Sequence, residues 1–316
     1  MTMTRFPAGR RALFAAGAAA LAAPASAQGR SLRIGYQKYG TLVLLKGRGA
    51  LEQELRGEGV RVAWTEFPAG PALLEAMNAG AIDLGAVGET PPVFAQAAGA
   101  PVLYVAHEPP APRGEAILVR RDSPIRGVAE LRGKKVAFNK GSNVHYLLVR
   151  ALEAAGLRYS DIEPATLPPA DARAAFERKQ VDAWAIWDPF LAAAEAATGA
   201  RQLADGTGLV SNHQFYVAAE RFAAANAPLV DAVVAALAET AAWVGGDVPA
   251  AARALSPGVG IPAPVLEAAM RRQAYGVRPL DGAVTAEQQR IADTFHGLGL
   301  LPRAIRVADA VRQTGA

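Results

Sequence analysis

The fold is decided by two stretches of similar sequence: residues 67–91, FPAGPALLEAMNAGAIDLGAVGETP, and residues 167–189, LPPADARAAFERKQVDAWAIWDP. Each predicts a turn, a helix, a β-branched residue followed by aspartate, a strand, an acidic residue and a proline that begins the next helix. Pro68 lies 100 residues before Pro168, and Asp83 lies 99 residues before Asp182. Chance similarity in an alanine-rich chain is the alternative, and we favour two lobes of related design. Two copies are too few for a solenoid.

Short apolar runs alternate with helical patterns around both copies. The predicted strands are residues 33–37, 62–66, 82–87 and 135–139, and the predicted helices are residues 72–78 and 144–155. Gly156 fits the position that follows a helix C-cap. Strands that alternate with helices through short turns predict an α/β fold with parallel sheets.

Two further strand patterns, residues 116–121 and 214–218, predict strands that cross from the first lobe to the second and back. We therefore expect a first lobe of residues 28–117 and 218–316 and a second lobe of residues 118–217. The chain after residue 219 predicts alanine-rich scaffold helices, for example at residues 227–245, 264–275 and 286–298.

The first 27 residues predict a secretory signal peptide. Three arginines precede an apolar run of about 12 residues, and the small residues Ala25-Ser26-Ala27 follow it. A membrane span needs about 20 residues, so we expect export with cleavage after Ala27. The pair Arg10-Arg11 leaves the twin-arginine and the general secretory routes open. No later apolar run approaches 18 residues, and we expect a soluble mature protein.

Composition excludes several classes of protein. The 316 residues suffice for roughly two domains, and 51% apolar with 20% charged residues excludes a wholly disordered chain. The absence of cysteine excludes disulfides, zinc–thiolate and iron–sulfur sites and a cysteine nucleophile. The sequence pI of about 9.5 owes much to the three arginines before residue 28. The remaining chain is nearly neutral, which gives no argument for a nucleic-acid partner.

Motifs for catalysis and for cofactors are missing from the sequence. It has no Walker loop, no Rossmann glycine fingerprint after the first strand and no Gly-x-Ser-x-Gly elbow. The four histidines, His107, His145, His213 and His296, are scattered without metal-binding spacing, and we interpret each as structural. We therefore expect no cofactor, no metal and no catalytic residue.

Three predicted strands end in a polar, glycine-containing turn that begins a helix. The turns are residues 38–41, 88–90 and 140–143, with Thr90 as the predicted cap of one helix and Ser142 or Asn143 as that of another. A helix N-terminus carries unpaired N–H groups and a partial positive charge, so it binds anions. Such loops face the ligand crevice of an open α/β sheet. With Gly40, Gly88 and Gly141 allowing close approach, we expect the three starts to converge on one anion.

Five segments together resemble the aliphatic-sulfonate-binding proteins of ABC transporters, which are grouped with the taurine- and nitrate-binding periplasmic proteins. The segments are GYQKYG (35–40), VGETPP (87–92), EPP (108–110), NKGSNVHY (139–146) and IWDPF (186–190). The resemblance covers about residues 31 to 300. It implies a two-lobed periplasmic-binding-protein fold of type II, with crossing strands and a cleft that closes on the ligand. It also implies delivery from the periplasm to a membrane permease powered by a cytoplasmic ATPase, for sulfur uptake.

A sulfonate site needs hydrogen-bond donors, because a sulfonate is ionised at physiological pH and its three oxygens only accept. Backbone N–H groups and five polar side chains meet this need: Gln37, Thr41, Thr90, Ser142 and Asn143. The organic tail needs an apolar wall, for which we name Tyr39, Trp187 and Phe215. Trp187 as simple core packing is the alternative.

Three acidic residues near these segments, Glu89, Glu108 and Asp188, leave two interpretations open. A carboxylate beside an anion opposes binding, so the three side chains either brace loops or clamp the lobes together. Alternatively, Glu108 and Asp188 bind a ligand ammonium group such as that of taurine.

Three other functions are alternatives for such a chain. A desulfinating or pyrimidine-precursor enzyme on the same fold would lean on cysteine or a histidine-rich site, so we expect no enzyme. Binding of nitrate, taurine, an aromatic sulfonate or a thiamine precursor stays open. A protein–protein module would leave a polar cleft unexplained. We expect a monomer.

Overall fold

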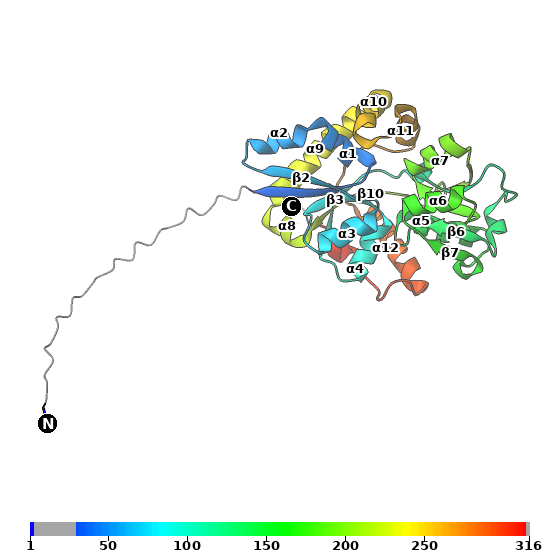
Figure 1. Ribbon diagram of the computed structural model, residues 1–316, viewed down its shortest axis with the longest axis horizontal. Helices are drawn as coiled ribbons and strands as arrows, with labels where there is room; N and C mark the ends of the chain where they lie inside the picture. Colours follow the sequence, from blue (N-terminus) through cyan, green and yellow to red (C-terminus); the bar gives the residue numbers. More distant parts are fainter. Residues whose placement is uncertain (3–29, 314–316) are drawn as a thin grey trace.

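The chain folds around two five-stranded sheets that lie side by side (Figure 1). The computed structural model describes residues 1–2 and 30–313. The predicted signal peptide, residues 1–27, lies outside the described residues except for its first two. The predicted cleavage site after Ala27 and the Arg10-Arg11 pair also lie outside them. The predicted α/β class is confirmed.

The first sheet has the strand order β2-β1-β3-β10-β4. Its strands are β1 (Ser31–Tyr36), β2 (Arg61–Glu66), β3 (Leu84–Gly88), β4 (Val102–His107) and β10 (Gln214–Ala219). β1 pairs in parallel with β2 and β3, whereas β10 is antiparallel to both β3 and β4. The sheet is therefore mixed and not purely parallel as expected, because a strand from the second half of the chain inserts in the opposite direction.

The second sheet repeats this arrangement with the order β7-β6-β8-β5-β9. Its strands are β5 (Glu115–Val119), β6 (Lys135–Phe138), β7 (Glu163–Thr166), β8 (Ala183–Trp187) and β9 (Arg201–Asp205). β6 is parallel to β7 and β8, and β5 is antiparallel to β8 and β9.

The two repeat aspartates hold equivalent places in the two sheets. The carboxylate of Asp83 accepts a hydrogen bond from the backbone N–H of Arg33 at 2.9 Å, and that of Asp182 accepts one from Lys135 at 2.9 Å. In each sheet the aspartate thus bonds to the strand beside its own. Two lobes of related design therefore explain the repeat better than chance.

Helices pack against both sheets. One face of the first sheet is covered by α1, α2, α9 and α10, and its other face by α3, α4 and α12, while α5, α6 and α7 share a core with the second sheet. The helices in the first half of the chain are α1 (Gly40–Arg48), α2 (Ala50–Arg56), α3 (Gly70–Asn78), α4 (Thr90–Ala97) and α5 (Asn143–Ala154). The remaining helices are α6 (Pro169–Glu177), α7 (Phe190–Thr198), α8 (Glu220–Ala225), α9 (Ala227–Gly246), α10 (Val248–Val259), α11 (Ala263–Met270) and α12 (Gly282–Gly297). Short 3₁₀ turns lie at η1 (Pro112–Gly114), η2 (Val128–Leu131), η3 (Tyr159–Asp161) and η4 (Val307–Ala310).

The chain crosses between the sheets in residues 108–114 and 206–213. The N–H of Ala111 donates to Ser211 O at 3.0 Å and that of Gly206 to Pro112 O at 2.9 Å, so the two crossings run beside each other. The predicted crossing strands correspond to β5 and β10, but each of these lies wholly in one sheet. The lobe boundaries at residues 117/118 and 217/218 stay a prediction, and sheet membership favours boundaries within the two crossings.

The C-terminal helices differ in part from expectation. α11 ends at Met270, five residues before the predicted end at residue 275, and α10 adds a helix to the predicted examples.

Among the described residues, α9 is the one helix whose length and hydropathy would suit a membrane span. Its apolar residues, such as Leu229, Val233 and Leu237, are buried in the core below the first sheet. α11 contacts α7 across the two lobes (Figure 1).

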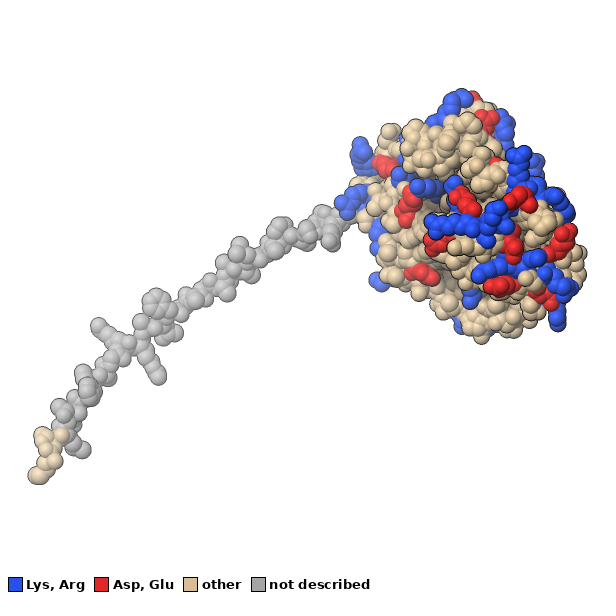
Figure 2. Space-filling view, turned by 45° about the vertical axis from the view of Figure 1, so that its right-hand side comes forward, with Lys and Arg blue, Asp and Glu red and all other residues tan. Residues whose placement is uncertain are grey.

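Charges of both signs are intermixed on the face drawn in Figure 2. This distribution agrees with the nearly neutral chain that follows residue 27.

Candidate functional site

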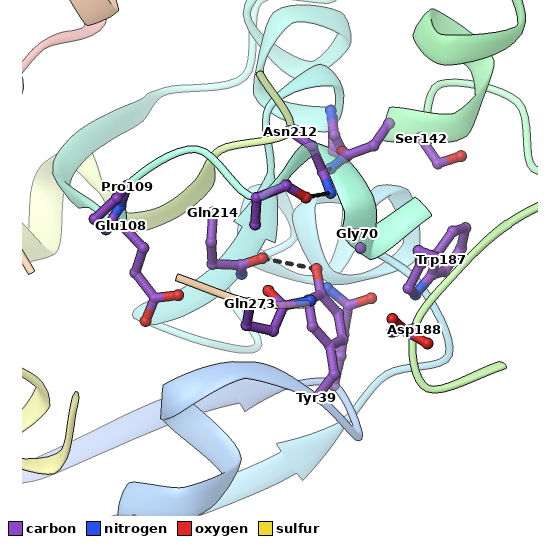
Figure 3. A pocket seen from close by; sticks show the side chains of 16 residues that line it. Tyr39, Gly70, Glu108, Pro109, Ser142, Trp187, Asp188, Asn212, Gln214 and Gln273 are labelled. Atoms are coloured by element: carbon purple, nitrogen blue, oxygen red, sulfur yellow. Dashed lines mark hydrogen bonds between the residues drawn. The ribbon is translucent and has the colours of Figure 1, made fainter. Parts of the chain in front are cut away.

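A narrow pocket lies between the two sheets, at the carboxyl ends of β1, β3 and β8 (Figure 3). Its cavity volume is about 20 Å³, which is room for about one water molecule. Residues from both lobes and from the segment after α11 line it: Gln37, Tyr39, Gly70, Gly88, Pro91, Glu108, Pro109, Ala111, Gly114, Ser142, Asn143, Trp187, Asp188, Asn212, Gln214 and Gln273. The position matches the ligand crevice of open α/β sheets.

Eight of the predicted site residues line this pocket, and six do not. Those that line it are Gln37, Tyr39, Gly88, Glu108, Ser142, Asn143, Trp187 and Asp188. Those that lie outside its lining are Gly40, Thr41, Glu89, Thr90, Gly141 and Phe215.

Three helices begin around the pocket, as expected, although their caps differ from the prediction. α1, α4 and α5 start at Gly40, Thr90 and Asn143, and none of the three has a side-chain cap hydrogen bond. Thr90 is the first helical residue and not the N-cap, which is Glu89. Ser142 holds the N-cap position of α5, but its Oγ donates to Asn139 O at 2.6 Å. At the start of α4 the N–H of Thr90 lies 3.5 Å from Asn143 Oδ1. A helix start without a cap of its own generally leaves further backbone N–H groups for another acceptor.

The glycine at the end of β3 makes room for a side chain from the other lobe. A Cβ at Gly88 would lie 2.1 Å from the amide of Asn143. Asn143 Nδ2 donates to Asn212 Oδ1 at 2.6 Å, and Asn212 Nδ2 donates to Ala111 O at 2.9 Å. Asn143 thus ties the start of α5 to the first sheet and to both crossing segments.

Amide and phenol groups supply the polar part of the lining. Tyr39 OH donates to Gln214 Oε1 at 2.8 Å, the contact drawn in Figure 3. Burial raises the pKa of the Tyr39 hydroxyl above its ordinary value, so the group stays a donor. Gln37 Nε2 donates to Ala86 O at 3.1 Å. Within the described residues, the side-chain amide nitrogens of Gln214 and Gln273 donate no hydrogen bond, and both residues line the pocket.

Glu108 is held firmly although it lines the pocket. Its Oε1 accepts a hydrogen bond from Tyr216 OH at 2.5 Å and another from Thr41 Oγ1. Its carbonyl oxygen accepts from Nδ1 of both His107 and His213, at 2.9 and 2.7 Å. Burial raises the pKa of the carboxyl to about 7. Thr41 therefore braces Glu108, and its hydroxyl is not free to serve an anion.

Asp188 forms an ion pair with an arginine that follows α11. Nη1 of Arg272, which follows α11, lies 3.4 Å from both carboxylate oxygens of Asp188, and Nη2 lies 2.5 Å from Glu195 Oε2. Asp188 Oδ1 also accepts from the N–H of Ala192 at 3.0 Å. Burial raises the pKa of Asp188 to about 6, although the arginine opposes that shift.

Glu89 braces a crossing segment behind the pocket. Its Oε2 accepts from the N–H of His213 at 3.0 Å, whereas its buried Oε1 has no partner among the described residues. Burial raises its pKa to about 8. Glu115 at the start of β5 is a second buried carboxyl without a described partner for either oxygen, and burial raises its pKa well above the ordinary value. Both carboxyls are therefore easily protonated, which limits the negative charge near the cleft.

The comparisons with known proteins agree with this geometry. The NMT1/THI5-like family model matches residues 55–249. The aliphatic sulfonates-binding protein of Escherichia coli (strain K12) is 45% identical over 294 residues, which cover 92% of each chain. The chain belongs to the NMT1/THI5-like family, and within it to the aliphatic-sulfonate-binding proteins. The family predicted from the sequence motifs is thus confirmed.

Two solved structures of aliphatic-sulfonate-binding proteins share the fold. The alkanesulfonate-binding protein SsuA from Xanthomonas axonopodis pv. citri, bound to MOPS, has a TM-score of 0.87 and 45% identity. The match covers 92% of this chain and 100% of that one. The periplasmic aliphatic sulphonate binding protein SsuA from Escherichia coli has a TM-score of 0.82 and 45% identity, covering 90% of this chain and 93% of that one.

Sequence reasoning missed half of the pocket lining of this aliphatic-sulfonate-binding family member. The residues missed are Gly70, Pro91, Pro109, Ala111, Gly114, Asn212, Gln214 and Gln273. Gln214 could have been predicted from the sequence, because it is next to Phe215 on a strand and neighbouring side chains on a strand face opposite sides. Phe215, named in its place, packs in the core of the first sheet with its ring centroid 5.0 Å from that of Tyr104. Gln273 follows a scaffold helix, and no sequence motif around it indicates a binding site.

Residues 1–2 and 30–313 contain no group of three or more histidine, aspartate or glutamate side chains placed to hold a metal ion. The pocket lining likewise contains no lysine or arginine. The donors available to an anion there are neutral amide, hydroxyl and backbone groups.

Proposed function

We propose that this protein captures alkyl sulfonates in the pocket between its sheets and delivers them to an ABC transporter for sulfur uptake. The observation that carries the proposal is a cleft between the lobes, where helix starts, side-chain amides and Trp187 lie together. The chain is also 45% identical to aliphatic-sulfonate-binding proteins. In this proposal the protein binds and releases its ligand unchanged and is not an enzyme.

The chemistry of the lining suits a strong-acid anion. Neutral donors hold a sulfonate without a counter-charge, and the uncapped starts of α4 and α5 add oriented N–H groups. Because the cavity has room for about one water molecule, a ligand enters only when the lobes separate. We infer a hinge in the two crossing segments, with the ligand stabilising the closed state.

The wider system belongs to the same proposal. We propose that residues 1–27 direct export, with cleavage after Ala27, and that the mature monomer works in the periplasm. The partners would be a permease in the inner membrane and its cytoplasmic ATPase. The similarity to periplasmic sulfonate-binding proteins supports this assignment.

Sulfonates without an ammonium group are the favoured class. The carboxylate of Asp188 is engaged by Arg272, and one oxygen of Glu108 by Thr41 and Tyr216. A ligand ammonium would have to compete with these partners. The bracing interpretation of the two acids is therefore preferred to direct contact with taurine.

Calorimetric titration of the chain from residue 28 onward, in sulfonate-free buffer, tests the proposal. The panel is ethanesulfonate, octanesulfonate, taurine, MOPS, nitrate and sulfate. We expect micromolar or tighter binding of alkyl sulfonates and none of sulfate. Preference for taurine would give Glu108 or Asp188 a direct role, and no heat with any sulfonate would overturn the assignment.

A further inference from the structure

The pocket between the sheets is lined by two carboxyl groups, and only one of them has a cationic partner. Glu108 and Asp188 lie on opposite sides of the pocket (Figure 3). The carboxylate of Asp188 pairs with Arg272. Glu108 Oε1 accepts only from the neutral hydroxyls of Thr41 and Tyr216, and its Oε2 accepts no hydrogen bond within residues 30–313. No lysine or arginine of these residues pairs with Glu108.

The other titratable groups around the Glu108 carboxyl bring no positive charge to it. Three tyrosine hydroxyls interact with its charge, from the turn after β1, from β10 and from the segment after α11: Tyr39, Tyr216 and Tyr275. Burial, and then the charge of Glu108, raise the pKa of all three, so they stay neutral. Nδ1 of His107 and Nδ1 of His213 contact the backbone carbonyl oxygen of Glu108 and not its carboxyl group. Burial also lowers the pKa of His107, which favours its neutral ring.

A sulfonate in this pocket would meet an uncompensated like charge if Glu108 were ionised. Two negative charges in one small, poorly solvated space repel each other, and the weaker acid relieves the repulsion by taking a proton. The sulfonate is a strong acid and stays ionised, so the proton goes to the carboxyl group. Burial already raises the pKa of Glu108 to about 7, although the hydroxyls of Thr41 and Tyr216 oppose that shift.

We propose that sulfonate binding takes up one proton from solution, and that Glu108 accepts it on its free carboxylate oxygen, so that the occupied pocket carries a single negative charge. The inference rests on the proposed function and adds its regulation by pH. A bound anion raises the pKa of Glu108 above its value in the ligand-free protein. Affinity is therefore constant at low pH, where the free protein already holds the proton. It falls as pH rises between the two pKa values, by at most about tenfold per pH unit for one proton.

Calorimetric proton counting tests the inference. Ethanesulfonate is titrated into the wild-type chain from residue 28 onward at pH 7.5 in phosphate and in Tris, whose ionisation enthalpies differ. Because the ligand does not titrate in this range, a binding heat that depends on the buffer counts protons taken up by the protein. We expect about half to one proton per ligand at pH 7.5, and an affinity that falls about tenfold or more from pH 5.5 to pH 8.5.

Glu108→Gln separates the proton from the shape of the side chain. The variant has the shape of the protonated acid, keeps an oxygen for Thr41 and Tyr216, and cannot titrate. It should bind ethanesulfonate without proton uptake, with an affinity constant within about twofold over the pH range, and more tightly than wild type at pH 8.5. Glu54→Gln, at an exposed position of α2, is the matched control and should keep the wild-type uptake.

Infrared difference spectra give a second readout that needs no variant. Ligand binding should convert a carboxylate band of the wild-type protein into a carboxylic-acid band, and this change should be missing in Glu108→Gln. A buffer-independent heat with constant wild-type affinity would overturn the inference and leave the proposed function standing. Proton uptake that persists in Glu108→Gln, with thermal unfolding showing the variant folded, would also overturn it. If wild-type protein bound no sulfonate at any pH, the proposed function itself would fail.

Discussion

The side chain of Asn143, at the start of α5, lies directly on the Cα of Gly88, at the end of β3. A Cβ at residue 88 would come within 2.1 Å of both amide atoms of Asn143. The same amide reaches Asn212 at 2.6 Å and the N–H of Thr90 at 3.5 Å. Gly88 ends a strand of the first sheet and Asn143 begins a helix packed on the second, so we expect separation of the lobes to break this contact.

Gly88→Ala should weaken ligand binding by about tenfold or more, because the methyl group expels the Asn143 amide and disfavours the closed state. Calorimetric titration measures the effect. The control is Gly47→Ala in α1, where a Cβ meets nothing within 4 Å. In a double-mutant cycle, Gly88→Ala should cost little once Asn143→Ala is present. Additive losses would contradict the contact.

Arg272→Gln should weaken ligand binding by about tenfold and lower the melting temperature. The substitution leaves the buried Asp188 carboxylate without its cation. It also removes the ion pair between Arg272, which follows α11, and Glu195 of α7. Ligand dissociation rates and thermal unfolding measure the two effects. Arg271→Gln is the matched control, because Arg271 is exposed and pairs with Glu267 on its own helix. Equal behaviour of the two variants would rule out a clamp.

Ser142→Asp should weaken sulfonate binding by about tenfold or more, because it sets a negative charge in the pocket at the start of α5. Ser160→Asp, an exposed change in η3 of the same lobe, should leave affinity unchanged. Titration of both variants with one alkyl sulfonate makes the comparison. Wild-type affinity in Ser142→Asp would remove Ser142 from the site.

Glu89→Gln should flatten the pH dependence of stability. Burial raises the folded-state pKa of Glu89 to about 8, above its ordinary value of 4.5. Between these values the folded protein keeps a proton that the unfolded chain has released, so the free energy of unfolding falls as pH rises through this window. The stabilisation is complete below pH 4.5 and is lost above about pH 8.

Urea unfolding of the Glu89→Gln variant between pH 5 and pH 8.5 measures this dependence. The variant should lose less stability than wild type over the range, by about 1–3 kcal/mol. Glu75→Gln, at an exposed position of α3, should keep the wild-type slope. An unchanged slope in Glu89→Gln would assign the pH dependence to other groups.

Part of the site was predictable because its signals are local. Gln37, Gly88, Ser142 and Asn143 stand in turns that end a strand and begin a helix, and such turns face the crevice in any open α/β sheet. The other part was not, because it depends on which face of a strand is buried. Phe215 and Gln214 are neighbours on β10, and packing against Tyr104 sends the phenylalanine into the core and the glutamine into the pocket.

The sequence by itself determined the α/β class, the repeated unit and the helix starts at the cleft, since hydrophobic periodicity, aspartate placement and turn residues act over short stretches of chain. Only the tertiary structure decided that β5 and β10 insert antiparallel, that Gln273 joins the lining and that Arg272 holds Asp188 across the lobes. These features join segments separated by about 60 or more residues. No local pattern encodes such pairings, because they follow from how whole helices and sheets pack.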